Sequence, residues 1–282
     1  MKKFALITGA NAGIGKETAL GLAKAGFRVG MICRDAERAE AARQDILVQV
    51  PAADLSLWIA DLASLTSVRG LVIKLKDQEQ KVDVLLNNAG IFTTDYQTTE
   101  DGFERQFGVN HLGHFLLTHL LLDMLREAPQ GRIINVSSTA HQFGKIDFDD
   151  LHHRDDYSGI RAYGQSKVAN VLFTYSLHKR LKNSTITANC LHPGAVGTDF
   201  GVQNSGFFVG MIWKLMRPFL ISPAEGARTS LHLAMTPDLA TVSGKYFDNC
   251  RVKPSSEYSR RPEIAERLWT LSADLVGEQA ID

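Results

Sequence analysis

Short apolar runs alternate with longer amphipathic segments through most of the chain, and this alternation is the strongest constraint on the fold. Six runs have strand length and are almost continuously apolar, as expected for strands covered on both faces. Alternating strands and helices of these lengths predict β-α-β units with right-handed crossovers and a parallel sheet. The predicted strands are 4–8, 28–33, 55–60, 82–87, 132–137 and 185–191, and the predicted helices are 14–25, 36–50, 64–80, 100–127 and 162–182.

The remaining sequence completes this pattern. A seventh strand is expected near 244–247, and a helix is expected after Pro262. The sequence contains no internal repeat and no linker-like tract, so we expect one domain over residues 1–282. The predicted fold class is α/β: a single-domain Rossmann fold with a doubly wound, mostly parallel seven-stranded sheet and helices on both faces.

Composition excludes several classes of protein. The chain has 31 basic and 31 acidic residues, and nucleic-acid binders usually carry a basic excess. The three cysteines form no CxxC pair, and their odd number argues against a disulfide framework. The apolar stretch after Lys3 is too short for a signal peptide, and no run approaches the ~20 residues of a transmembrane helix. We therefore expect a cytoplasmic protein without a transmembrane segment.

A glycine-rich turn follows the first strand and opens a helix. Its sequence is Thr-Gly-Ala-Asn-Ala-Gly-Ile-Gly at positions 8–15. Glycines permit a tight turn and let backbone N–H groups approach a pyrophosphate, which the helix N-terminus also attracts. A strand-to-helix turn that needs glycine for packing alone is the alternative interpretation.

The end of the second strand bears on the choice of cofactor. An acidic residue near this position usually binds the ribose 2′-hydroxyl of NAD, but here Cys33 is followed by Arg34. An arginine suits a 2′-phosphate and predicts a roughly 10- to 150-fold preference for NADP(H), with NAD(H) still possible. Two alternatives remain: Arg34 pairs with Asp35 or Glu37 in solvent, or Asp35 is itself the ribose ligand.

Tyr163 and Lys167 lie four residues apart, so a helix places them on one face. A nearby ammonium group stabilises a phenolate and would lower the tyrosine pKa from about 10, which suits proton transfer to or from a carbonyl oxygen. Such pairs arise by chance in many helices. Here the preceding strand ends at Ser137 and Ser138, and ligands bind at the carboxyl ends of strands in open α/β sheets.

Taken in order, these motifs resemble the short-chain dehydrogenase/reductase family. The matches are TGANAGIG at 8–15, Asp61 after the third strand, NNAG at 87–90, Asn110, NVSS at 135–138, YGQSK at 163–167 and HPG at 192–194. The phrases VNHLGH at 109–114, NVSSTAH at 135–141 and GKYF at 244–247 are similar to the retinol dehydrogenase-like branch.

The resemblance implies roles for individual residues. Tyr163 would be the general acid/base, Lys167 would tune it and hold the nicotinamide ribose, Ser138 would bind the substrate oxygen, and Asn110 would support a proton path. Ser138 is preferred to Ser137 because the family's serine aligns with the second of the pair. The implied cofactor-binding residues, besides Arg34, Tyr163 and Lys167, are Gly9, Asn11, Gly13, Ile14, Gly15, Asp61, Leu62, Asn88, Ala89, Gly90, Pro193, Gly194, Val196 and Thr198. Lys16 either reaches the phosphates or is solvated.

Histidines and acids elsewhere invite a metal interpretation that the spacing does not favour. The segment 141–162 is rich in Asp and His but matches no structural zinc pattern, and hydride transfer needs no metal. We expect a solvated loop and no metal site. His111, His114 and His119 lie among apolar neighbours in the predicted helix 100–127 and are expected to be packed or helix-surface residues.

The segment 200–220 is strongly apolar, and in this family the corresponding segment covers the substrate. It predicts a hydrophobic carbonyl or alcohol substrate, such as an aldehyde, a retinoid or a lipid ketone. The alternatives are an ordinary core helix or peripheral contact with a membrane. A homodimer through the helices of Asn110 and Tyr163 is possible. The alternative functions are a catalytically idle NADP(H)-binding sensor or interaction protein, and an enzyme that reduces a carbon–carbon double bond.

Overall fold

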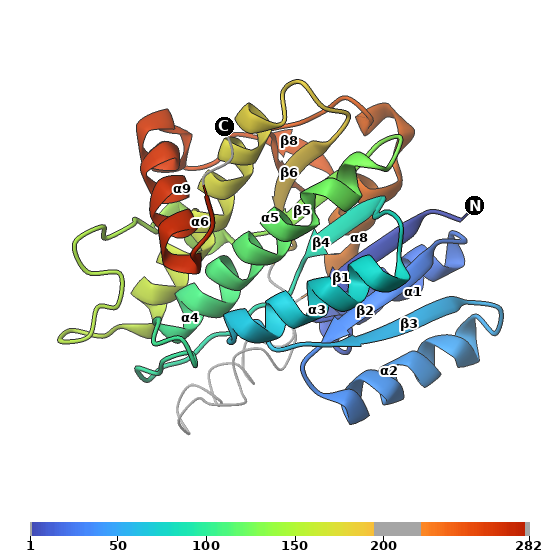
Figure 1. Cartoon of the computed structure of the whole chain (residues 1–282). Helices are drawn as coiled ribbons and strands as arrows, with labels where there is room; N and C mark the ends of the chain where they lie inside the picture. Colours follow the sequence, from blue (N-terminus) through green and yellow to red (C-terminus); the bar gives the residue numbers. More distant parts are fainter. Residues whose placement is uncertain (1, 195–220, 280–282) are drawn as a thin grey trace.

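The computed structural model describes residues 2–194 and 221–279 (Figure 1). Its centre is an eight-stranded sheet with the strand order β3-β2-β1-β4-β5-β6-β7-β8. All neighbouring strands pair in parallel except β7 and β8, which are antiparallel. The strands are β1 (Phe4–Thr8), β2 (Arg28–Cys33), β3 (Asp54–Ile59), β4 (Val84–Asn87), β5 (Arg132–Val136), β6 (Thr187–His192), β7 (Tyr246–Asp248) and β8 (Arg251–Lys253).

Helices cover both faces of this sheet (Figure 1). One apolar layer joins the sheet to α1 (Gly13–Lys24), α2 (Ala36–Gln49) and α8 (Pro223–Met235). The other joins it to α3 (Leu65–Gln78), α5 (Gly113–Arg126), α6 (Gly159–Arg180) and α9 (Pro262–Val276). Short helical turns lie at α4 (Arg105–Phe107), η1 (Gly108–Leu112), η2 (Thr139–Gln142), η5 (Pro237–Leu239) and η6 (Tyr258–Arg260).

The predicted α/β architecture, a mostly parallel sheet between two helical layers, is confirmed. The predicted number of seven strands is wrong, because β8 adds an eighth strand at the edge of the sheet. All three residues of β8 are exposed, and Val252 keeps 54% of its surface accessible. A three-residue strand without a buried face has no apolar pattern by which the sequence could reveal it.

The predicted helix 100–127 begins later and is interrupted. The Glu104 carboxylate accepts hydrogen bonds from the backbone N–H groups of Gln106 and Phe107, so helical structure begins at Arg105. A π-helical turn, η1, then separates α4 from α5. Single π turns inside α-helices are frequent at functional sites.

The strand order reverses between β1 and β4, and we call the region outside the carboxyl ends of these two strands the β1–β4 crevice. The chain proceeds outward from β1 through β2 to β3 and then crosses back to β4 on the other side. Ligands of open α/β sheets bind at such a switch point, outside the carboxyl ends of the strands. The turns at Gly9 and Asn88, which end β1 and β4, lie at this point.

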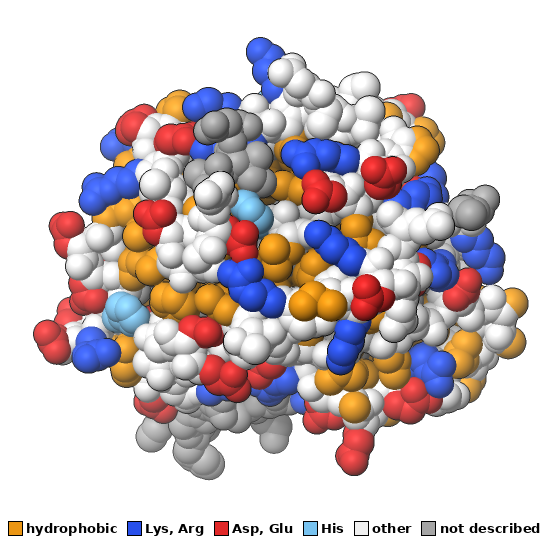
Figure 2. Space-filling view, in the orientation of Figure 1, with side chains coloured by type: hydrophobic (Ala, Val, Ile, Leu, Met, Phe, Trp, Pro, Cys, Tyr) orange, Lys and Arg blue, Asp and Glu red, His pale blue; other side chains and the backbone are white. Residues whose placement is uncertain are grey.

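Basic and acidic side chains are interspersed over the face of the molecule drawn in Figure 2. This mixture agrees with the balance of 31 basic and 31 acidic residues. Among the described residues, no helix combines the length and the apolar character that a bilayer crossing requires.

Candidate active site

The turn after β1 packs so closely that its glycines cannot carry side chains. Gly9 and Gly13 have φ angles of 66° and 51°, where L-residues are strained. A Cβ on Gly15 would lie 2.2 Å from the Gly9 carbonyl oxygen and 2.6 Å from Asn88 Nδ2. This geometry is required both if the glycines serve only to pack the turn and if they let backbone N–H groups approach a pyrophosphate.

The start of α1 favours the phosphate interpretation. Its N-cap, Ala12, provides no side-chain hydrogen bond, and its first turn contains no acidic residue. The first backbone N–H groups of the helix are therefore uncapped, with the positive end of the helix dipole behind them. This arrangement fits the pyrophosphate of a dinucleotide.

Side chains join the ends of β1 and β4 across the crevice. Thr8 Oγ1 accepts hydrogen bonds of 2.9 Å from the backbone N–H groups of both Asn88 and Ala89. Asn88 Nδ2 donates to the Thr8 carbonyl at 2.8 Å. His114 Nδ1 donates to the Asn110 carbonyl at 3.1 Å, so its Nε2, 2.9 Å from Thr8 Oγ1, accepts the hydroxyl proton. His114 is thus a neutral bridge between the glycine turn and η1, and burial lowers its pKa to about 4.

The end of β2 presents an exposed arginine. Cys33 is buried, whereas Arg34 is exposed and forms no ion pair with any residue in 2–194 or 221–279. Asp35 caps α2 by accepting the backbone N–H of Arg38 at 3.0 Å. The alternative interpretation, in which Arg34 pairs with Asp35 or Glu37, is therefore not seen among the described residues.

Two other predicted cofactor contacts have local partners. The Lys16 ammonium group contacts the Asp45 carboxylate instead of pointing freely toward the turn. Asp61 Oδ1 accepts the backbone N–H of Ala63 at 2.9 Å, which fixes the chain after β3 beside Leu62. Of the other implied residues, Val196, Thr198 and the segment 200–220 lie outside the described residues.

Ser138, Tyr163 and Lys167 converge at the carboxyl end of β5. The Tyr163 hydroxyl hydrogen-bonds the side chain of Ser138. Lys167 Nζ donates to the Val136 carbonyl at 3.3 Å and lies 5.5 Å from the centre of the Tyr163 ring. The hydroxyl of Ser137 points elsewhere, because it donates to the Lys167 carbonyl at 2.8 Å.

Burial pushes both titrating groups of this set toward their neutral forms. Desolvation raises the pKa of Tyr163 to about 12, against a smaller lowering by the Ser138 hydrogen bond. Desolvation also lowers the pKa of Lys167 to about 8. The sequence predicts a lowered tyrosine pKa, and the structure gives the opposite direction because removing the phenolate from water outweighs its nearby donors.

Asn110 links the loop after β4 to α6. Its Oδ1 accepts the backbone N–H of Ile91 at 2.7 Å, and its Nδ2 donates to the Ile91 carbonyl at 3.0 Å. The same Nδ2 lies 3.0 Å from Ser166 Oγ, whose hydroxyl donates to the Tyr163 carbonyl at 2.8 Å. Asn110 therefore fixes the turn of α6 that carries Tyr163.

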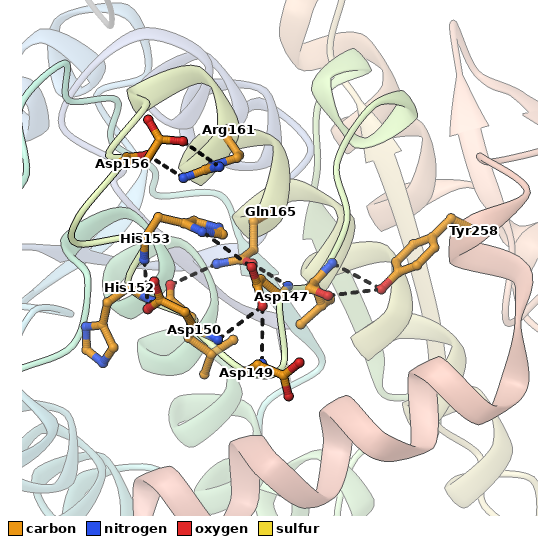
Figure 3. Close-up of polar contacts among 11 residues, drawn as sticks. Asp147, Asp149, Asp150, His152, His153, Asp156, Arg161, Gln165 and Tyr258 are labelled. Carbon is orange, nitrogen blue, oxygen red and sulfur yellow. Dashed lines mark hydrogen bonds and ion pairs between the residues drawn. The ribbon is translucent and has the colours of Figure 1, made fainter.

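The loop rich in Asp and His folds around its own backbone (Figure 3). Asp147 Oδ1 accepts the backbone N–H groups of Asp149 and Asp150 at 3.2 and 3.1 Å. Asp150 Oδ1 accepts those of His152 and His153, both at 3.0 Å. Within the part of the chain that the structure describes, no three His, Cys, Asp or Glu side chains are grouped to hold a metal ion.

Contacts made by His114, His141, His192 and Ser166 near the site were not expected from the sequence. His114 was expected to be a packed or surface residue, and no role was assigned to the other three. Each contacts backbone or side-chain atoms far away in the sequence. A single polar residue among apolar neighbours gives no periodic signal in the sequence. Its hydrogen-bond partner can therefore be identified only from the folded structure.

A groove of about 570 Å³ lies away from these residues. It is lined by the end of α6, by β8 and by the start of α9, including Tyr175, Val252 and Pro262. Tyr175 lies twelve residues after Tyr163 on the same helix, about 18 Å along its axis. The predicted site residues do not line this groove.

Comparisons with known proteins agree with this geometry. Residues 3–205 match the short chain dehydrogenase family. Retinol dehydrogenase 12 of Mus musculus is 44% identical over 277 residues, which cover 98% of this chain and 87% of the relative. Retinol dehydrogenase 13 of Homo sapiens is 47% identical, with 99% of this chain and 86% of the relative covered.

Solved structures share the fold. An uncharacterized protein from Mycobacterium paratuberculosis is 34% identical, with a TM-score of 0.78 and coverage of 99% of this chain and 94% of that protein. A short chain dehydrogenase of Shigella flexneri complexed with NADP is 22% identical and has a TM-score of 0.69, covering 88% of this chain and 97% of that one. The chain described here therefore belongs to the short-chain dehydrogenase family, a group of NAD(P)(H)-dependent oxidoreductases, and acts on CH–OH groups.

Proposed function

We propose that the chain transfers a hydride between NADP(H) and the carbonyl or alcohol carbon of a hydrophobic, retinoid-like substrate. The observation that carries this proposal is the hydrogen bond between Ser138 and Tyr163 beside the buried ammonium group of Lys167. These groups lie at the carboxyl edge of the sheet, where ligands of such folds bind. Bound nicotinamide would supply or accept the hydride.

Tyr163 is held in the protonated form that carbonyl reduction uses. A phenol whose pKa is raised to about 12 is protonated at neutral pH and can donate to a carbonyl oxygen as negative charge develops there. The Ser138 hydroxyl would bind the same oxygen. Lys167, with its pKa lowered to about 8, would bind the nicotinamide ribose and return a proton toward the tyrosine. Asn110 would keep this turn of α6 in place.

Support for NADP(H) comes from the end of β2. Arg34 is exposed beside the crevice and is not held by an acidic neighbour in the described chain. Asp35 uses one carboxylate oxygen to cap α2, which argues against Asp35 as the main ribose ligand. A guanidinium group at this position suits a phosphate monoester through paired, charge-assisted hydrogen bonds.

Support for a hydrophobic substrate comes from relatives and from the site wall. The curated relatives are retinol dehydrogenases over nearly the whole of this chain. Phe92 packs edge-on against Tyr163 with 5.7 Å between the ring centres. An aromatic wall beside the proton donor suits an apolar carbonyl compound better than a sugar or an acid.

The test is NADPH oxidation by the full-length protein with all-trans-retinaldehyde and a series of aliphatic aldehydes. We expect turnover that falls about 10²- to 10⁴-fold in Tyr163→Phe, because the proton donor is lost. Tyr175→Phe is the matched control, because Tyr175 lies farther along α6 and bonds Ser255 at 2.7 Å. Equal rates in the wild type and Tyr163→Phe would refute the assignment. Binding of NADPH without turnover of any carbonyl compound would identify an idle nucleotide-binding protein instead.

A further inference from the structure

Two histidines connect the turns beside the proposed site to the C-terminal segment 246–256. His141 lies three residues after Ser138, and His192 ends β6 just before Pro193 and Gly194. His141 is fully buried, and the His192 side chain keeps 12% of its surface accessible. Neither histidine belongs to the set of groups proposed above to carry out the chemistry.

The hydrogen bonds of His141 determine its tautomer. Its Nδ1 lies 2.6 Å from the Ser138 carbonyl oxygen, which can only accept, so this nitrogen carries the proton. Its Nε2 lies 3.2 Å from the backbone N–H of Ser256, which can only donate, so this nitrogen is bare. His141 is therefore a neutral Nδ1–H imidazole that joins the Ser138 turn to the chain after β8.

His192 makes the same kind of bridge with the opposite tautomer. Its Nδ1 accepts the backbone N–H of Gly194 at 3.0 Å, so Nδ1 is bare. Its Nε2 lies 3.2 Å from Asp248 Oδ1, and the ion pair with Lys253 helps to keep that carboxylate charged. His192 is therefore a neutral Nε2–H imidazole that joins the Gly194 turn to β7.

The two bridges share one anchor, Tyr246 of β7. The ring of His141 lies 4.7 Å from the Tyr246 ring, and the ring of His192 is stacked on Tyr246 with 6.5 Å between centres. Tyr246 is almost fully buried. The short strand β7 thus contacts both histidines through one side chain.

We propose that His141 and His192 are positioning residues that fix the Ser138 turn and the Gly194 turn against the segment 246–256 as neutral imidazoles of opposite tautomer. This inference rests on the proposed function only in taking these two turns as parts of the substrate and nicotinamide sites. His141 then sets where the Ser138 hydroxyl points. His192 sets where the chain leaves β6, next to the cofactor.

Protonation breaks each bridge on a defined side. A proton on His141 Nε2 would face the N–H of Ser256, and a proton on His192 Nδ1 would face the N–H of Gly194. Burial lowers the pKa of both histidines. A smaller effect raises each pKa: the hydrogen bond to the Ser138 carbonyl for His141, and the charge of Asp248 for His192. The charged or titratable groups that face them are each other, Asp248, Lys253 and the Tyr246 phenol. Both bridges are therefore intact at neutral pH, and because both pKa values are lowered, the bridges open only at a pH below the ordinary histidine range.

Asparagine and glutamine variants separate the two ends of each bridge. At either position, asparagine can replace only the bond made by Nδ1, and glutamine can replace only the bond made by Nε2. We expect His141→Asn and His141→Gln each to lower kcat about 10- to 100-fold with little change in KM for NADPH, as expected for one lost buried hydrogen bond. We expect His192→Asn and His192→Gln to weaken NADPH binding by a similar factor with a smaller change in kcat. His178→Asn is the control, because His178 is exposed at the far end of α6.

The pH profile distinguishes positioning from a general loss of structure. In the wild type, kcat should fall only at a pH below the ordinary histidine range, because the pKa of His141 is lowered, and this decline should be absent from the profile of His141→Asn. NADPH binding depends on pH for a second reason, because the 2′-phosphate of NADPH itself titrates near pH 6. The contribution of His192 is therefore the part of this pH dependence that His192→Asn removes. Parallel losses of kcat and cofactor affinity in all four variants, with unchanged pH profiles, would overturn the proposal.

A spectroscopic test does not depend on activity or on variants that fold. Long-range proton–nitrogen spectra of the isotope-labelled full-length protein distinguish protonated from bare imidazole nitrogens. At neutral pH we expect His141 as the Nδ1–H tautomer and His192 as the Nε2–H tautomer. The reverse tautomers, or rapidly exchanging ones, would refute the bridges even in an active enzyme. If both histidines show the expected tautomers but Tyr163→Phe does not change the rate of NADPH oxidation, the bridges are supported and the proposed function is refuted.

Discussion

The two sides of the proposed site are held in different ways. At the β1–β4 crevice the backbone itself packs closely, and Gly9, Gly13 and Gly15 make that approach possible. Beyond β5 the turns are held by side chains, above all by His141 and His192, which reach the C-terminal strands. The first arrangement also includes one imidazole, His114, but burial lowers its pKa to about 4, so it stays neutral far below neutral pH. The second depends on imidazoles staying neutral, so the two sides should respond differently to acid and to substitution.

Acid should have its largest effect on stability through two fully buried histidines, one of which, His114, lies on the β1–β4 side. His111 and His114 are fully buried, and desolvation lowers their pKa values to about 3 and about 4. Because these values lie below the unfolded value of about 6.5, the unfolded chain binds more protons and the free energy of unfolding falls as the pH drops below 6.5. Between about pH 7.5 and about pH 5, each histidine should cost roughly 2 kcal/mol.

Urea unfolding at the two pH values measures this loss. His111→Asn should reduce the pH dependence by about the share of one histidine, whereas His178→Asn should leave most of it in place. His111 Nε2 bonds Ser272 of α9 at 2.8 Å, so the variant will also be less stable at neutral pH. The informative quantity is therefore the difference between the two pH values. Equal free energies at both would show that these histidines are not held neutral.

Two adjacent serines test whether the catalytic side depends on one hydroxyl. Ser138→Ala should lower kcat about 10²- to 10³-fold, the usual effect of removing a donor to a developing oxyanion. Ser137→Ala removes the bond to the Lys167 carbonyl and should cost about 1 kcal/mol of stability with kcat nearly unchanged. Steady-state kinetics and thermal unfolding of both variants decide the matter. Similar kcat values for the two variants would contradict the assignment of Ser138.

The framework of the fold could be predicted because its causes are periodic. The seven parallel strands lie within two residues or so of the predicted ones, since buried strands need continuous apolar runs. The glycine turn was also recognisable, because positive φ angles at Gly9 and Gly13 and close backbone approach at Gly15 favour glycine at all three positions. Both signals are local in the sequence.

What the sequence did not reveal depends on long-range partners. Glu104 caps α4 and is itself held by the hydroxyl of Tyr157 at 3.0 Å, so the irregular loop before Arg105 is fixed by a residue 53 positions away. The bridges of His114, His141 and His192 likewise join segments far apart along the chain. The pKa of Tyr163 could not be read from its spacing to Lys167, because burial decides its direction.

The close packing of the nucleotide side predicts a strong dependence on Gly15. Gly15→Ala places a methyl group 2.2 Å from the Gly9 carbonyl oxygen, and relieving that contact should cost about 1–3 kcal/mol and weaken NADPH binding. Gly70→Ala is the matched control on α3, where an added Cβ meets nothing within 4 Å. That change should stabilise the protein by about 0.5–1 kcal/mol. If Gly15→Ala is as stable as Gly70→Ala and binds NADPH normally, the described turn is wrong.

The last prediction concerns charge at the rim of the same crevice. Arg34→Ala should reduce the preference for NADPH over NADH about 10- to 150-fold through weaker NADPH binding, with NADH binding nearly constant. Arg38→Ala is the control. Arg38 is also exposed and lies in the first turn of α2, where the Asp35 carboxylate accepts its backbone N–H. Since the contact is an exposed ion pair, added salt should weaken NADPH binding more in the wild type than in Arg34→Ala. If Arg34→Ala discriminates between NADPH and NADH as the wild type does, Arg34 does not bind the 2′-phosphate. The nucleotide side of the site would then bind the cofactor through backbone contacts, without a contribution from Arg34.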